Sequence, residues 1–195
     1  MVSRRVVLTT GAASAVIAGL GAGWWTTTKP ATRAREPWAR ASSGFGDPRL
    51  DVLAYAILAP NPHNMQPWRI QLGASNSFAV YCDLDRTLPH TDPPHRQITI
   101  GFGCFLELCA QAAAESGLRA DITYFPDGEP EPLLDDRPIA NVELVEDTTV
   151  KPDPLFVTAL ERRTNRFEYD LSRPVDVATL ENLEAVTVAP VRVVA

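Results

Sequence analysis

Residues 59–68, with the sequence APNPHNMQPW, decide the fold that we expect for this chain. Its three prolines fix φ near about −65° and lack backbone donors, so the stretch should be a stiff, non-helical loop. Three amide side chains, Asn61, Asn64 and Gln66, can each donate and accept hydrogen bonds. Such a frame suits a planar ligand rimmed with carbonyls and ring nitrogens. The alternative is a plain helix-to-strand connector, capped by Asn and anchored in the core by Trp68.

The same loop resembles the P-S-x-x-N-x-Q-P-W signature of the FMN-dependent nitroreductase superfamily. Pro60, Asn61, Asn64 and Gln66 occupy the matching positions, with Asn61 where the family has Ser. The resemblance implies that the loop lies along the flavin, which in many members is the flavin of the opposite subunit. Because an amide replaces a hydroxyl, the contacts implied at residue 61 differ from those of the family.

The elements around the loop follow from hydrophobic spacing. Asp47 and Pro48 should start a helix, as an N-cap followed by Pro, and this helix should end before Pro60. Strands are expected at 68–72, 78–83, 119–125 and 139–145, with short helices at 154–163 and after Asp176 and a last strand at 191–195. With the resemblance, this predicts an α+β fold of nitroreductase type, in which helices flank a central mixed or antiparallel sheet.

A long, almost wholly apolar helix is expected at 96–116 and should be buried on most sides. Its residues 100–118 also resemble the long interior helix of nitroreductases. Gly101 and Gly103 lower helix stability relative to Ala, which indicates that something packs closely against them. Either another helix or a flavin ring would explain these two positions.

The first 35 residues are expected to be a targeting segment. Ser3–Leu8 (SRRVVL) resembles the twin-arginine export consensus, and the apolar stretch 11–25 is short for a bilayer span but typical of a signal sequence. This predicts export by the twin-arginine translocation machinery to the cell envelope or beyond. No clear A-x-A cleavage site follows, so retention as an N-terminal membrane tether is the alternative.

Charge and cysteine content exclude some classes of function. The chain has 18 Lys and Arg against 24 Asp and Glu, and five of the basic residues lie in the targeting segment, which leaves a net charge of −11. An acidic body of this kind argues against nucleic-acid binding. Cys82, Cys104 and Cys109 are expected to be buried free thiols, and no metal site is predicted.

A second polar cluster, ERRTNR, lies at 161–166. Guanidinium groups bind phosphate oxygens in pairs, so three arginines and a hydroxyl would suit the phosphate of FMN. The alternative is a solvated helix end at which Arg offsets the helix dipole. The cluster resembles the R-x-S-x-R flavin-phosphate motif that opens a nitroreductase domain, with Arg162, Thr164 and Arg166 at the matching positions.

The order of the two motifs is unusual, because the arginine motif ordinarily precedes the loop and here follows it by about a hundred residues. This order resembles the Acg-like branch, in which two nitroreductase-like halves lie in one chain. The resemblance implies that residues 36–160 are a first half. Residues 161–195 would then begin a second half that is truncated, because the sequence ends at Ala195.

These patterns predict an FMN-dependent oxidoreductase that transfers hydride from NAD(P)H or another donor to a nitro, quinone or similar acceptor. No catalytic side chain is predicted, because the cofactor carries the chemistry, and the chain lacks the G-x-G-x-x-G of a Rossmann nicotinamide site. The partners expected are a small-molecule donor and acceptor, with a homodimer as a further expectation. The alternatives are a flavin-binding protein without turnover, an inactive truncated relic and a membrane-tethered interaction domain.

Overall fold

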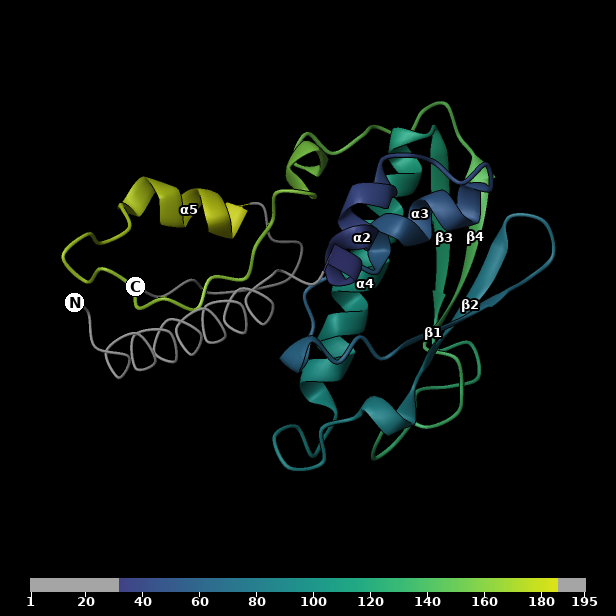
Figure 1. Cartoon of the computed structure of the whole chain (residues 1–195), viewed down its shortest axis with the longest axis horizontal. Coiled ribbons are helices and arrows are strands. Elements are labelled where there is room, and N and C mark those ends of the chain that lie inside the picture. The colour runs from purple at the N-terminus through teal and green to yellow at the C-terminus, as the bar shows by residue number, and fades with distance from the viewer. Residues whose placement is uncertain (1–31, 186–195) are drawn as a thin grey trace, which may run out of the picture. The chain divides into compact units, whose positions relative to one another are not determined.

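A computed structural model describes residues 32–185 (Figure 1). The chain divides into two compact units, one ending at Arg162 and one starting at Arg163. The twin-arginine motif, the apolar stretch 11–25 and the strand expected at 191–195 lie outside the described residues.

The larger unit is built on a four-stranded sheet, which confirms the α+β class with an antiparallel sheet. The strands are β1 (Trp68–Leu72), β2 (Ser77–Cys82), β3 (Leu118–Tyr124) and β4 (Ala140–Glu146), in the order β1-β2-β4-β3 with every neighbouring pair antiparallel. Along β2 the buried positions are Phe78, Val80 and Cys82, the alternation that the sequence predicts.

Two helices cover the buried face of this sheet (Figure 1). Helix α3 (Pro48–Ala56) begins where predicted, because the Asp47 carboxylate accepts a hydrogen bond from the backbone N–H of Arg49. Helix α4 (Arg96–Glu115) is the central helix, and its Phe102 and Phe105 are fully buried. By length and composition α4 could cross a membrane, but half of its apolar window is buried inside the fold, as in the core helix of a globular domain.

Trp68 connects the end of the loop to this core. Its ring meets Phe102 edge-on, with 5.2 Å between centroids, and lies 4.9 Å from the ring of Phe105. This is the core-anchor role that the sequence indicates for Trp68. Helix α2 (Thr32–Ala41), which was not expected, crosses the predicted end of the targeting segment at residue 35, and its Ala41 packs on α3.

The helix predicted at 154–163 is wrong except for one 3₁₀ turn, η3 (Phe156–Thr158). Phe156 is buried against Tyr55, with 4.7 Å between ring centroids, but Leu155, which was expected to point inward, is 71% exposed. Ala159 and Leu160 are half-buried and also pack against the core, so three of the four residues expected to point inward do so. A helix of this length is marginal in water by itself.

The smaller unit contains α5 (Val177–Ala185). Its start is the one predicted, because the Asp176 carboxylate accepts a hydrogen bond from the Thr179 N–H at 2.9 Å. Before α5 the described backbone has no regular element, and Phe167 and Tyr169 are each 85% exposed.

Candidate functional site

The candidate site is the loop of residues 59–68, called the amide loop below, which joins α3 to β1 (Figure 1). It contains one 3₁₀ turn, η1 (Pro62–Asn64). Three of its non-glycine residues have a left-handed backbone, His63 at φ 50°, Asn64 at φ 54° and Gln66 at φ 48°. Each such residue costs roughly 1–2 kcal/mol, so the loop keeps this shape only because its contacts enforce it.

Asn61 closes the loop on itself. Its Nδ2 donates to the Ala59 carbonyl at 3.1 Å, and its Oδ1 accepts from the Gln66 N–H at 2.8 Å. Both polar atoms of the side chain are therefore engaged inside the loop, and Asn61 acts as a scaffold. A Ser hydroxyl, with a single oxygen on a shorter side chain, would not make the same two contacts.

The other two amides lie nearer to solvent. Gln66 Nε2 is 3.4 Å from Asn64 Oδ1, a long hydrogen bond, while Asn64 is exposed and Gln66 is half-buried. Within residues 32–185, neither Asn64 Nδ2 nor Gln66 Oε1 has a hydrogen-bond partner. Asn64 Nδ2 is thus available as a donor and Gln66 Oε1 as an acceptor, on neighbouring side chains of the amide loop. Pro60, at the start of the loop, is exposed.

The central helix supports the loop at Gly101. A Cβ added there would lie 3.5 Å from Asn61 Cβ and 3.6 Å from Pro62 Cδ, which is ordinary van der Waals distance. What packs at Gly101 is therefore the amide loop, in place of the helix or flavin ring considered from the sequence. Gly103 is exposed, and apart from its chain neighbours and the backbone of its own helix no atom of the described residues lies within 4 Å of its added Cβ.

Arg162 is brought to the start of the amide loop from 104 residues away. Its Nη2 donates to the Leu58 carbonyl at 2.7 Å, in the turn that follows α3. One arginine of the predicted phosphate cluster thus lies beside the loop. Thr164 and Arg166 belong to the smaller unit, where both are exposed.

Comparison with known proteins adds partial relatives from Mycobacterium tuberculosis. A protein of strain H37Rv named "Putative NAD(P)H nitroreductase Rv3131" is 37% identical over 76 residues, 39% of this chain and 22% of the relative. Another, named "Putative NAD(P)H nitroreductase acg", is 37% identical over 71 residues, 36% of this chain and 21% of the relative. These partial matches support the nitroreductase family, and with it the general class of nitroreductase-type oxidoreductases.

A longer match reaches a protein of the same strain named "Uncharacterized protein Rv3127", which is 31% identical over 125 residues, 62% of this chain and 35% of the relative. The chain therefore spans about a fifth to about a third of the length of these relatives. No protein-family model matches the chain. The antiparallel sheet flanked by helices is compatible with a nitroreductase-like fold.

One residue that contacts the amide loop was missed from the sequence. Arg86, in the 3₁₀ turn η2 (Leu84–Arg86), donates from Nη1 to the Met65 carbonyl at 3.0 Å. The only local signal is the spacing of Asp83 and Arg86, which form an ion pair at 3.1 Å. That spacing does not reveal a contact to a carbonyl 21 residues earlier.

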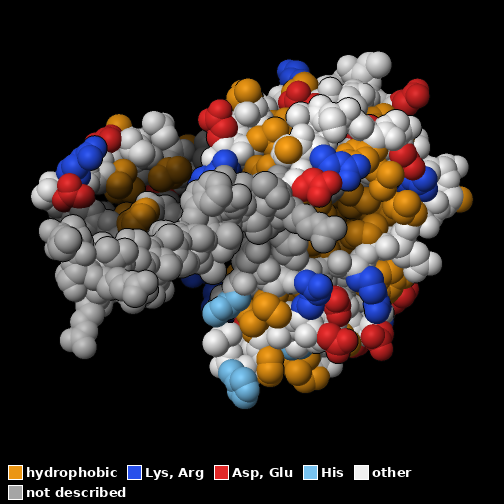
Figure 2. Space-filling model, viewed as in Figure 1, with side chains coloured by type: hydrophobic (Ala, Val, Ile, Leu, Met, Phe, Trp, Pro, Cys, Tyr) orange, Lys and Arg blue, Asp and Glu red, His pale blue; other side chains and the backbone are white. Residues whose placement is uncertain are grey.

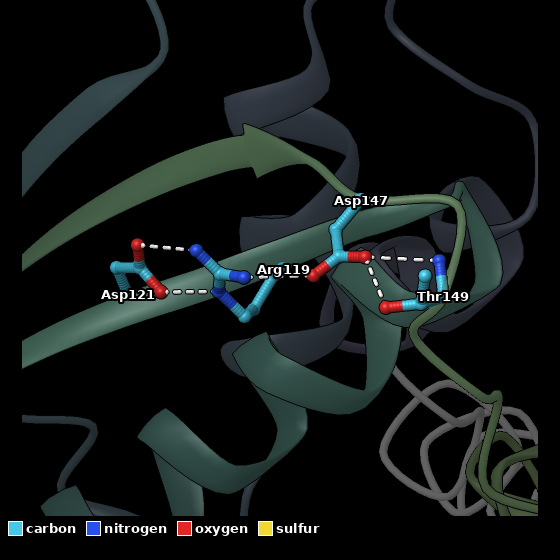
Figure 3. Close-up of polar contacts among 4 residues, drawn as sticks. All are labelled: Arg119, Asp121, Asp147 and Thr149. Carbon is cyan, nitrogen blue, oxygen red and sulfur yellow. Dashed lines mark hydrogen bonds and ion pairs between the residues drawn. The ribbon is translucent and has the colours of Figure 1, made fainter.

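The most extensive ionic cluster involves the sheet and is separate from the amide loop. Figure 3 shows Arg119 of β3 between Asp121 and Asp147, at 2.6 Å and 2.7 Å. Hydrogen bonding to Arg119 lowers the pKa of Asp121, and hydrogen bonds from Thr149, followed by Arg119, lower the pKa of Asp147. Each carboxylate has a cation or a hydroxyl partner, so we assign this cluster a structural role.

The three cysteines are free, and two of them are buried as predicted. Burial raises the pKa of Cys82 to about 11 and also raises the pKa of Cys109, which keeps both as unreactive thiols. Cys104 is half-buried. No group of three or more His, Cys, Asp or Glu side chains is placed to hold a metal ion within residues 32–185.

Two hollows on the larger unit are lined by other segments than the amide loop. An apolar hollow of about 400 Å³ lies between α2 and α3, where Figure 2 shows hydrophobic side chains gathered; its lining includes Phe45, Leu50 and Ile57. A polar hollow of about 380 Å³ lies on the outer face of the sheet and includes Gln71, Tyr81 and Asn141. The amide loop presents His63 and Asn64 on an open surface.

Proposed function

We propose that this chain binds FMN and forms part of a nitroreductase-type oxidoreductase. The observation that carries the proposal is the hydrogen bond from Arg162 to Leu58, which holds a cation beside a strained loop of amides. When bound, FMN supplies hydride transfer between a reduced donor and a nitro, quinone or similar acceptor. The partial relatives named as nitroreductases support the same class of reaction.

The donor set fits this cofactor at both ends. A flavin ring carries carbonyls and ring nitrogens at its rim, and the amide loop offers Asn64 Nδ2 as a donor and Gln66 Oε1 as an acceptor. Pro60 adds an apolar contact beside them. A guanidinium such as that of Arg162 suits the phosphate, because its N–H groups match phosphate oxygens. By resemblance to the family motif, we propose Thr164 and Arg166 as further phosphate contacts.

In this proposal the protein binds and orients, and none of its side chains acts as an acid or a base. Asn61 keeps the loop closed, and the remaining amides set the position of the ligand. Because the loop lies on an open surface, another protein surface is needed to exclude water from the reacting ring. We propose that a second nitroreductase-like half, as in Acg-like proteins, or a second copy of the chain supplies it.

We also propose that the protein is exported by the twin-arginine pathway, from the SRRVVL motif and the apolar stretch that follows. This pathway carries folded proteins, often with a cofactor already inserted, which agrees with a flavoprotein. Reduced nicotinamide is scarce outside the cytoplasm. The physiological donor is then a different reductant, although NAD(P)H still serves as a test donor.

The test is purification of the full chain, followed by anaerobic reduction. The proposal predicts a yellow protein whose visible flavin absorption is bleached by NADPH or dithionite and returns when a nitroaromatic compound or a quinone is added. A yellow protein that dithionite bleaches but that no acceptor reoxidises would indicate flavin binding without turnover. A colourless protein that takes up no added FMN would overturn the proposal.

A further inference from the structure

One peptide unit of the amide loop is held at both of its polar atoms. The carbonyl of Met65 accepts from Arg86 Nη1 at 3.0 Å, and the N–H of Gln66 donates to Asn61 Oδ1 at 2.8 Å. These two atoms belong to the same planar peptide group, so the two hydrogen bonds fix its orientation. Gln66 follows directly with φ 48°, a conformation that a residue with a side chain rarely adopts.

Arg86 is itself anchored to the sheet. Its Nε donates to Asp83 Oδ2 at 3.1 Å, and Asp83 is the residue directly after β2. The backbone N–H of Asp83 donates in turn to the Pro67 carbonyl at 2.8 Å. Through these contacts the end of β2 holds the second half of the amide loop, while α4 holds the first half at Gly101.

We propose that Arg86 is a positioning residue for the ligand of the amide loop. By fixing the Met65–Gln66 peptide it keeps Gln66 left-handed, and this conformation places the Gln66 amide next to the Asn64 amide. The exposed ion pair with Asp83 contributes little stability by itself. The orientation of the peptide depends on the hydrogen bond from Arg86 to the Met65 carbonyl. This inference rests on the proposed function, because it assigns Arg86 to the orientation of FMN.

The chain provides a matched control in Arg49. This arginine also joins an Asp carboxylate to a distant carbonyl, with Nη2 at 2.7 Å from Asp47 and Nη1 at 2.7 Å from the carbonyl of Gly73. Its target lies at the turn between β1 and β2, outside the amide loop. Replacing Arg49 therefore removes the same kind of bridge without touching the proposed site.

The experiment compares the full chain with its R86Q, R86K and R49Q variants by fluorescence titration with FMN. R86Q should bind FMN about tenfold more weakly, the factor expected for one charge-assisted hydrogen bond. R86K should recover part of the affinity, because an ammonium group can still donate to the Met65 carbonyl. R49Q should bind as the wild type does. Hydrogen exchange of the peptide covering residues 61–67 should be faster in R86Q and unchanged in R49Q.

Each outcome has a distinct meaning. If the wild type binds FMN and R86Q binds equally well, the inference about Arg86 is wrong and the proposed function stands. Equal weakening in R86Q and R49Q would also overturn it, because a general loss of stability would explain both variants. If the wild type binds no FMN, the proposed function fails and the role of Arg86 fails with it. Should R86Q not fold, R86M, which also removes the donor to the Met65 carbonyl but keeps the aliphatic stem, is measured in its place, and wild-type FMN affinity and exchange in R86M would contradict the inference.

Discussion

The guanidinium of Arg162 donates to the carbonyl of Leu58 at 2.7 Å, and this bond joins the two segments that the sequence marks as flavin contacts. It brings one end of the arginine cluster next to the first residue of the amide loop. The same bond also serves the fold, because it satisfies a backbone carbonyl in the turn that follows α3. Arg162 is therefore expected to matter both for stability and for binding.

The two roles of Arg162 separate in a comparison with Arg166, which is exposed. An R162Q variant should lose about 1–2 kcal/mol in the free energy of unfolding without FMN, because the Leu58 carbonyl loses its partner. It should also bind FMN more weakly. R166Q should leave the free energy of unfolding unchanged and reduce only FMN affinity. Urea denaturation and FMN titration measure the two quantities, and an R162Q protein of wild-type stability would contradict the role assigned to the bond.

Asn61→Ser restores the residue found in the family and tests the scaffold role of Asn61. Because the Ser hydroxyl is a single oxygen on a shorter side chain, it should not reach both partners, and the Gln66 N–H or the Ala59 carbonyl should lose its contact. The free energy of unfolding should fall by about 1 kcal/mol, and hydrogen exchange at Gln66 should rise. Asn76→Ser is the control, because Asn76 is exposed in the turn between β1 and β2, outside the amide loop, and does not have a left-handed backbone. A variant N61S with unchanged exchange would show that the two bonds are dispensable.

The ionic cluster of Arg119 predicts how stability depends on pH. Asp121 has a folded pKa below its unfolded value of about 3.9, so its contribution is present above that value and lost as pH falls through the folded pKa. R119Q should therefore lower the melting temperature at neutral pH, and the difference should shrink as the pH falls below about 3.9 and through the lower folded pKa. R40Q, which removes one exposed 3.4 Å contact with Glu36 and the placement of the guanidinium over the Phe45 ring, should lower the melting temperature less than R119Q does. A difference for R119Q that persists at low pH would mean that packing is responsible.

Export can be tested independently of the fold. We expect a variant in which Arg4 and Arg5 are both replaced by Lys to stay in the cytoplasm, because the twin-arginine machinery recognises the arginine pair. Fractionation of cells that express the full chain measures the distribution. The change R33K and R35K, outside the motif, should not alter it. Normal export of the Lys-Lys variant would show that the motif is not a twin-arginine signal.

Local signals explain why much of the fold was predictable. The strands, α3 and α4 begin and end within a few residues of their predicted positions, since alternation, the Asp47-Pro48 start and the apolar run of α4 act over short stretches. At 154–163 the periodicity correctly marks Phe156, Ala159 and Leu160 as residues that pack, but packing of so short a segment does not require a continuous α-helix. The engagement of Asn61 inside its own loop and the contact of Arg86 with Met65 depend on three-dimensional closure, which spacing along the chain does not encode.

The central claim is that the amide loop holds the flavin ring and that the arginine cluster holds the phosphate. Comparing the dissociation constants of FMN and riboflavin tests it most directly, because only FMN carries the phosphate. We predict that the wild type prefers FMN, that R162Q with R166Q loses this preference, and that Asn64→Ala weakens both ligands by the same factor. Equal affinity of the wild type for FMN and riboflavin would contradict the claim.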